Sequence, residues 1–254
     1  MSSEFFLKVA LNAAELASQK IATAWEHSEV VIEEAHIHDF KIQLDKDVQT
    51  LIESIILRHF PSHAILGEEG ECLNEASPFQ WIVDPIDGTA NFTYGIPHFC
   101  ISIACQHNGK TILGVIADPI RKEIFTAVEK GGSKKNGKPI YVSKRATLAE
   151  AALAFGFGNE IEHGLKLYSY YGPRACKVRS MGSVSLNMAY LACGRIDGFI
   201  QNGVHIWDVA AGQLLIEEAG GKVTLTPLEK KHKYHICATN GLLVIEPPNI
   251  VQIE

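Results

Sequence analysis

The 254-residue sequence has no apolar run of the roughly 18 residues that a membrane-spanning helix requires. It has no excess of basic residues either, because 23 Lys+Arg stand against 29 Asp+Glu and give a net charge of −6. We therefore expect no membrane association and no nucleic-acid surface as its main feature. An anionic substrate stays compatible with this charge, because bound cations can reverse the sign of an acidic site.

Cysteine pairing and a targeting signal are also missing. The six cysteines include no C-x-x-C pair, and a chain of this size does not depend on a disulfide framework. The first twenty residues lack the basic-then-apolar layout of a signal peptide. Their apolar residues instead fall roughly on one face of an amphipathic helix. The sequence predicts a soluble, cytoplasmic protein.

The pattern of apolar residues differs between the first and the second part of the chain. The first part predicts helices at about 3–27 and 48–60, then short strands at 64–66, 81–83, 100–105, 112–117 and 123–128. This spacing favours a largely antiparallel sheet packed by the two helices. The second part alternates strands and helices, at 151–157, 183–193, 198–201, 209–219 and 222–225. We expect an α+β sub-domain over residues 1–143 and an α/β sub-domain over 144–254.

Two aspartates follow the apolar run Trp81-Ile82-Val83 in the stretch WIVDPIDGTANF. Pro85 favours an extended Asp84 and fixes its own φ, so we expect the chain to turn sharply as the strand ends. Asp84 and Asp87 can then face one small volume, with the carbonyl group of Ile86 also available. Oxygen donors in a rigid turn suit a hard divalent cation, above all Mg²⁺.

The residues that follow suit an anion. Gly88 lets a ligand approach the backbone closely, and the N–H groups of Gly88, Thr89 and Ala90 would be free if a helix begins there. The alternative is a plain loop, since Asp-Pro and Asp-Gly are common turn dipeptides.

Two further acidic stretches stand at the ends of apolar elements. Glu68 lies in Gly67-Glu68-Glu69-Gly70 after the strand at 64–66, and Asp208 heads the helix at 209–219. Taken singly, the glutamates fit a solvated loop and Asp208 fits a helix N-cap. Three acidic clusters placed in this way favour a shared metal site.

The segments GEEG, WIVDPIDGTANF and WDVAAGQLLIEEAGG, in this order and spacing, resemble the inositol monophosphatase family, a group of lithium-sensitive, Mg²⁺-dependent phosphatases. GSVSLNMAYLACGRIDGF is similar to the helix and strand of the family's second sub-domain, so the likeness covers nearly the whole chain. The resemblance implies a layered αβαβα sandwich with two sub-domains. It also implies a homodimer and a small phosphomonoester substrate.

The resemblance also implies roles for individual residues. One Mg²⁺ would be held by Glu68, Asp84 and the carbonyl group of Ile86, and a second by Asp84, Asp87 and Asp208. A third, weaker site would involve Glu68. Thr89, paired with Asp45, would help Glu68 to orient the attacking water. The substrate would contact Asp87, the amides of Gly88 and Thr89, and a pocket for the alcohol lined by Gly182, Ser183, Val184, Gln201 and Asp208.

Three positions depart from the animal enzymes of the family. Gln201 stands where these have an inositol-binding glutamate, Leu44 replaces a threonine, and Glu34 replaces a lysine. We predict Mg²⁺-dependent hydrolysis of myo-inositol 1-phosphate and related phosphomonoesters. The alternatives are histidinol phosphate, fructose 1,6-bisphosphate or a 3′-phosphonucleotide as substrate, or a protein that binds the transcription machinery and keeps residual phosphatase activity.

Two other motifs do not fit their usual functions. GSKKNGK matches most of a P-loop, but Pro139 stands where Mg²⁺ needs Ser or Thr, and strand-like sequence flanks the motif. His205, three residues before Asp208, is interpreted as a structural residue and not as a metal ligand.

Overall fold

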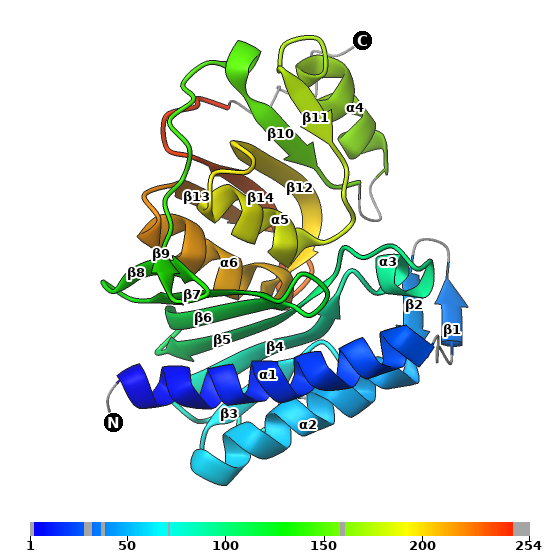
Figure 1. Ribbon diagram of the computed structural model, residues 1–254, viewed down its shortest axis with the longest axis vertical. Helices are drawn as coiled ribbons and strands as arrows, with labels where there is room; N and C mark the ends of the chain where they lie inside the picture. Colours follow the sequence, from blue (N-terminus) through cyan, green and yellow to red (C-terminus); the bar gives the residue numbers. More distant parts are fainter. Residues whose placement is uncertain (1–2, 28–31, 37–38, 71, 158–160, 246–254) are drawn as a thin grey trace.

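The computed structural model describes residues 3–27, 32–36, 39–70, 72–157 and 161–245. Helices and sheets alternate in five layers (Figure 1). Helices α1 (Ser3–His27) and α2 (Gln43–His59) form one outer layer, and α4 (Ile161–Tyr171) forms the other. Helices α5 (Val184–Ala192) and α6 (Ile206–Glu218) lie between the two sheets. The predicted αβαβα sandwich is confirmed.

The first sheet has seven strands in the order β3-β4-β5-β6-β7-β8-β9. All neighbours are antiparallel except β3 and β4, as the sequence predicted for most of this sheet. The strands are β3 (Ala64–Gly67), β4 (Phe79–Asp87), β5 (Cys100–His107), β6 (Lys110–Asp118), β7 (Glu123–Val128), β8 (Gly132–Lys135) and β9 (Lys138–Pro139). The P-loop-like segment is thus the β8–β9 hairpin.

The second sheet has five strands in the order β11-β10-β12-β14-β13. Strand β10 (Ala152–Phe155) is parallel to β11 (Lys177–Arg179) and to β12 (Gly198–His205). Strand β14 (Lys233–Thr239) is antiparallel to β12 and to β13 (Lys222–Pro227). Four short elements complete the described chain, namely β1 (Ile32–His36) and β2 (Asp39–Ile42), which pair with each other, α3 (Thr89–Thr93) and the 3-10 helix η1 (Leu148–Glu150).

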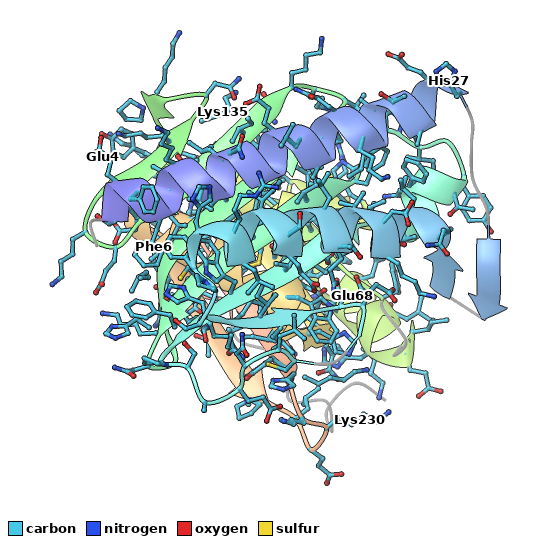
Figure 2. All side chains as sticks on the ribbon, turned by 90° about the horizontal axis from the view of Figure 1, so that it is seen from below. Glu4, Phe6, His27, Glu68, Lys135 and Lys230 are labelled. Carbon is cyan, nitrogen blue, oxygen red and sulfur yellow. The ribbon has the colours of Figure 1, made fainter. Side chains whose placement is uncertain are left out.

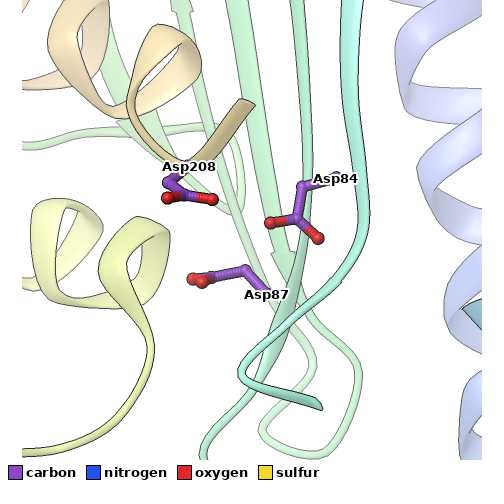
Figure 3. A group of neighbouring side chains, drawn as sticks. All are labelled: Asp84, Asp87 and Asp208. Atoms are coloured by element: carbon purple, nitrogen blue, oxygen red, sulfur yellow. The ribbon is translucent and has the colours of Figure 1, made fainter. Parts of the chain in front are cut away.

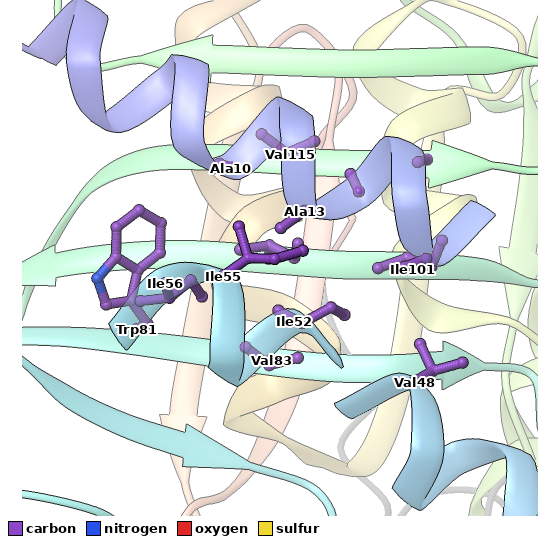
Figure 4. Close-up of a cluster of buried hydrophobic side chains, with 14 of the residues drawn as sticks. Ala10, Ala13, Val48, Ile52, Ile55, Ile56, Trp81, Val83, Ile101 and Val115 are labelled. Carbon is purple, nitrogen blue, oxygen red and sulfur yellow. The ribbon is translucent and has the colours of Figure 1, made fainter. Parts of the chain in front are cut away.

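One hydrophobic core joins α1 and α2 to the outer face of the first sheet (Figure 4). Ala10 and Ala13 of α1 are fully buried there, as are Ile52 of α2 and Val83 of β4. Helix α2 begins at Gln43, five residues before the apolar run at 48–60 that predicted it. Its first turn includes Asp45, whose negative charge is favourable near the positive end of the helix dipole.

A second core lies on the inner face of the first sheet and continues to the second sheet. It includes Ile116 of β6, Leu186 of α5, Leu215 of α6 and Phe199 of β12, all fully buried. Both inner helices are therefore covered on two sides, which explains why their sequences are apolar nearly all round. The division at residues 143 and 144 stays a prediction, and this shared core connects the two parts.

The segment that enters the second sheet is held by a buried carboxylate. Asp197 is completely buried, and its oxygens accept hydrogen bonds from Arg145 Nε at 2.8 and 2.9 Å, from the Ala152 N–H at 2.7 Å and from the Ser143 hydroxyl. A buried charge with this many donors is compensated where it lies.

Within the described residues, no helix is both long enough and apolar enough to cross a membrane.

His98 gives the fold a testable dependence on pH. Its side chain is 8% exposed. Burial, with a smaller contribution from Arg121, lowers its pKa from 6.5 to about 4. The unfolded chain therefore takes up a proton as the pH falls below 6.5, whereas the native chain does not until about pH 4. His98 is therefore expected to contribute a decrease in the free energy of unfolding over this interval, of up to about 3 kcal/mol.

Urea titrations between pH 7 and pH 4 measure this effect. His98→Gln should reduce the loss, and the buried His63, whose pKa burial also lowers, keeps its own contribution. His59→Gln, at an exposed position of α2, should leave the pH profile of the parent unchanged. Equal profiles for the parent and His98→Gln would contradict the interpretation.

Candidate metal centre

A β-bulge in strand β4 brings the two aspartates of DPID to the same face of the sheet. Asp84 lies opposite Ser102 and Asp87 lies opposite Cys100, so three steps along β4 match two steps along β5. Side chains three residues apart in a regular strand point to opposite faces, and one extra residue restores the same face. The expected end of the strand at Val83 was wrong, since β4 continues through Asp87. The expected convergence of the carboxylates is confirmed.

Asp208 approaches this pair from the second half of the chain. It is the third residue of α6, and its Oδ2 accepts a hydrogen bond from the His205 N–H at 2.7 Å. The N-cap position belongs to His205, so Asp208 is not itself the cap. Oxygens of Asp84, Asp87 and Asp208 all lie within 4.8 Å of one another (Figure 3).

The electrostatics of the triad fit a cation. Burial raises the pKa of Asp84 well above its usual range, and the nearby Glu68, Asp87, Asp208 and Asp45 raise it further. Burial also raises the pKa of Asp208, with further contributions from Asp87 and Glu68. The Oδ1 atom of Asp84 is buried and accepts no hydrogen bond from the described residues. A buried carboxylate oxygen without a donor fits a ligand of a hard divalent cation.

Asp87 differs from Asp84 because it receives several hydrogen bonds. Its Oδ1 accepts from the Val184 N–H at 3.2 Å, and its Oδ2 accepts from the Ser185 N–H at 2.7 Å and from the Ser183 hydroxyl. These donors lie at the N-terminus of α5, where a negative charge is favourable. Burial still raises the pKa of Asp87, and these hydrogen bonds oppose the rise. The Cys100 thiol also donates weakly to Oδ2, at 3.7 Å. Oδ1 accepts only one of these bonds, so it keeps a lone pair that can contact a cation.

Glu68 and Asp45 lie around the triad without belonging to its tightest group. Glu68 directly follows β3 (Figure 2), its side chain is exposed, and its N–H donates to the Val83 carbonyl group at 3.1 Å. Asp45 is 3% exposed in the first turn of α2. Both act on the charge of Asp84. The predicted acidic residues therefore gather in one region, although only three of them are within 4.8 Å of one another.

The predicted helix after Gly88 is present as α3. Thr89 begins it, and the Thr89 hydroxyl donates to the Ile86 carbonyl oxygen at 2.8 Å. Gly88 has a φ of +97°, and a Cβ there would lie 3.1 Å from the His98 carbonyl oxygen. A side chain at this position would therefore be strained and crowded.

The predicted alcohol pocket has two parts in the structure. Gly182, with a φ of +82°, Ser183 and Val184 form the start of α5, where the latter two bind Asp87. Gln201 lies half-buried in β12, and a Cβ added to Gly156 would overlap its carboxamide. Gly156 therefore leaves the space that Gln201 fills. Leu44 lies in the first turn of α2, and the side chain of Glu34 is outside the described part of the chain.

Sequence analysis missed a residue that joins the two halves at the site. The Asn91 Nδ2 donates to the His98 carbonyl oxygen at 2.7 Å and to the Met181 carbonyl oxygen at 2.8 Å. It thus fixes the approach to α5 from the DGTANF segment. The position of Asn91 within the DGTANF segment is the signal that could have identified it.

The comparisons with known proteins agree with this geometry. The model of the inositol monophosphatase family matches residues 2–246. The chain is 37% identical over 246 residues to the Nus factor SuhB of Pseudomonas aeruginosa, which covers 92% of this chain and 91% of that protein.

Solved structures are similar over almost the same length. The extragenic suppressor protein SuhB from Bartonella henselae superposes with a TM-score of 0.87 at 33% identity, and 93% of this chain and 94% of that chain are covered. An inositol monophosphatase from Anabaena (Nostoc) sp. PCC 7120 gives a TM-score of 0.83 at 36% identity, with 94% and 92% covered.

The different surroundings of Asp84 and Asp87 predict opposite effects of the same substitution. Asp84→Asn removes a buried charge that has no donor, so it should raise the melting temperature of the metal-free protein. Asp87→Asn leaves one acceptor oxygen for three donors at the start of α5, so it should lower the stability by about 1 kcal/mol. Both variants should lose most of the stabilisation that Mg²⁺ gives to the parent.

Thermal unfolding in EDTA and across a Mg²⁺ titration measures both effects. Shifts of equal sign for the two variants in EDTA would contradict the difference that we assign to their hydrogen bonds.

Proposed function

The chain belongs to the inositol monophosphatase family, and on this premise we propose that it is a Mg²⁺-dependent phosphomonoesterase whose substrate is myo-inositol 1-phosphate. The observation that carries the proposal is the group formed by the buried Asp84 and Asp87 of β4 and the half-buried Asp208 of α6. Such a group of oxygens is unfavourable without a cation and suits the coordination of Mg²⁺.

The proposed ligands follow the family pattern. Glu68, Asp84 and the Ile86 carbonyl oxygen would hold one Mg²⁺, and Asp84, Asp87 and Asp208 would hold the second. Bound Mg²⁺ ions lower the pKa of water and stabilise the attacking and leaving oxygens of an in-line displacement. This chemistry explains why a protein of net charge −6 can accept an anionic phosphate at an acidic centre.

The protein's own groups would orient the reactants. Glu68, supported by Thr89 and Asp45, would accept a hydrogen bond from the attacking water. The Thr89 hydroxyl already donates to the Ile86 carbonyl oxygen, so its oxygen is left as an acceptor. The amides of Gly88 and Thr89 would bind the phosphate, and their positions depend on the left-handed backbone at Gly88.

Gln201 supports a broad choice of alcohol. An uncharged amide presents one acceptor oxygen and two donor hydrogens, whereas a carboxylate accepts from two neighbouring hydroxyl groups. We propose that inositol 1-phosphate and simpler esters such as glycerol 2-phosphate are both hydrolysed. Gly182, Ser183, Val184 and Asp208 would complete this pocket. Histidinol phosphate, fructose 1,6-bisphosphate and 3′-phosphonucleotides are the competing substrates.

The name of a relative favours a second candidate function. The similar protein of Pseudomonas aeruginosa is a Nus factor, so binding to the transcription machinery is the alternative for this chain. Co-precipitation with RNA polymerase, measured beside phosphatase activity, separates the two functions. By the same family resemblance, we propose a cytoplasmic homodimer that Li⁺ inhibits.

Metal dependence is the first test of the enzyme. EDTA should abolish phosphate release, Mg²⁺ should restore it, and Ca²⁺ should not, because the larger ion takes a looser coordination. A phosphate-release assay over the competing substrates then identifies the alcohol. Full activity in EDTA would contradict the proposed dependence on Mg²⁺. A kcat/KM on histidinol phosphate or a 3′-phosphonucleotide that is at least about tenfold higher than on myo-inositol 1-phosphate would contradict the substrate assignment. A tenfold ratio corresponds to about 1.4 kcal/mol of transition-state binding.

Gln201→Glu tests whether Gln201 is the reason that the enzyme would accept several phosphomonoesters. A charge-assisted hydrogen bond is about twice as strong as a neutral one, so the added charge should favour inositol 1-phosphate by about 1 kcal/mol over glycerol 2-phosphate. This corresponds to a change of less than about tenfold in the ratio of kcat/KM values. The Mg²⁺ dependence should not change. An unchanged ratio would exclude Gln201 from the alcohol pocket.

A further inference from the structure

A buried amide of helix α2 binds the peptide group beside Glu68. Gln49 is 4% exposed and lies four residues after Asp45 on the same helix. Its Oε1 accepts a hydrogen bond from the Glu69 N–H at 2.9 Å, and its Nε2 donates to the Glu69 carbonyl oxygen. One side chain therefore satisfies both backbone polar groups of the residue that follows Glu68.

A third contact fixes which way the amide of Gln49 points. Its Nε2 also donates to Glu53 Oε1 at 2.8 Å. The Glu53 carboxylate and the Glu69 carbonyl group are both acceptors, so both must face the NH₂ group, and the oxygen is left for the Glu69 N–H. The hydrogen-bond network thus permits one orientation of the carboxamide.

The backbone is held at three successive residues. Gly67 packs against Gln49 so closely that a Cβ would overlap the carboxamide. The Glu68 N–H binds the Val83 carbonyl group of β4 at 3.1 Å, and Glu69 binds Gln49. The Glu68 side chain is exposed, so the peptide groups on either side of it contribute to its direction.

We propose that Gln49 is a positioning residue that holds the Glu68 carboxylate toward Asp84 and thereby sets the Mg²⁺ affinity and the turnover rate. The turnover part rests on the proposed function, whereas the affinity part does not need catalysis. Partners that orient metal ligands typically change metal affinity or activity by about 10- to 100-fold when they are removed. Gln49 does this through backbone groups, so its effect should depend on the presence of the Glu68 carboxylate.

Gln49→Met tests the proposal, because methionine has a similar length and can make none of the three hydrogen bonds. We expect the Mg²⁺ affinity to fall by roughly tenfold, kcat to fall by a similar factor, and KM at saturating Mg²⁺ to change by less than about twofold. Gln49→Leu, which is also uncharged and makes none of these hydrogen bonds, should show the same loss and serves if Gln49→Met does not fold. Gln43→Met, at an exposed glutamine of the same helix, is the control and should match the parent.

A double-mutant cycle with Glu68→Gln decides whether Gln49 acts through Glu68. Calorimetry with Mg²⁺ alone gives the affinities of the four proteins, so the result does not require activity. We expect Gln49→Met to weaken binding in the parent and to have little further effect in the Glu68→Gln background. Equal losses in both backgrounds, or no loss in the parent, would overturn the proposal. If the parent binds Mg²⁺ with this pattern but releases no phosphate, the proposed function fails and the positioning role stands.

Discussion

The candidate site depends above all on the contact between Asp87 and the start of helix α5. Asp87 belongs to the first sheet, while Ser183, Val184 and Ser185 belong to the second half of the chain. Their hydrogen bonds join the two at the place where three carboxylates converge. A charge at a helix N-terminus is favourable, so the same residue that would bind a cation also stabilises the inner helical layer. Cation binding and the attachment of α5 therefore share one carboxylate.

The position of the other inner helix, α6, is also fixed by its contacts. Helix α6 carries Asp208 and lies directly on strand β6, where a Cβ on Gly114 would come within 2.7 Å of the Ala211 carbonyl oxygen. This close approach fixes the height of α6 above the sheet, and hence the distance from Asp208 to the β4 carboxylates. The acidic group is thus held by packing that extends well beyond its own residues, which is necessary because like charges repel in the absence of a cation.

The sequence predicted the elements with strong periodicity and the site residues with distinctive spacing. Helix α1 extends over the expected residues because its buried side chains recur at helical intervals. Helix α4 was missed because it is short and Gly164 interrupts its pattern, although that glycine packs closely against Phe157. Strand β14 was missed because KYHICAT lacks a clear alternation of apolar residues, and its central neighbour β12 lies before helix α6 in the sequence, although β13 directly precedes it. Gln49 has no local signal, since its role arises from a loop twenty residues away.

The bulge in β4 has a consequence for how the family's sequences can change. Asp84 and Asp87 share a face because the strand contains one residue more than its partner between them. Loss of a single residue there would preserve every side chain of the site and still turn one carboxylate toward the opposite face of the sheet, which packs against α1 and α2. Spacing within DPID is therefore under as strong a constraint as composition. Insertions and deletions are tolerable in the surface loops but not within the four residues of DPID. A deletion in DPID is therefore a better sign of a lost metal centre than a substitution of a neighbouring residue.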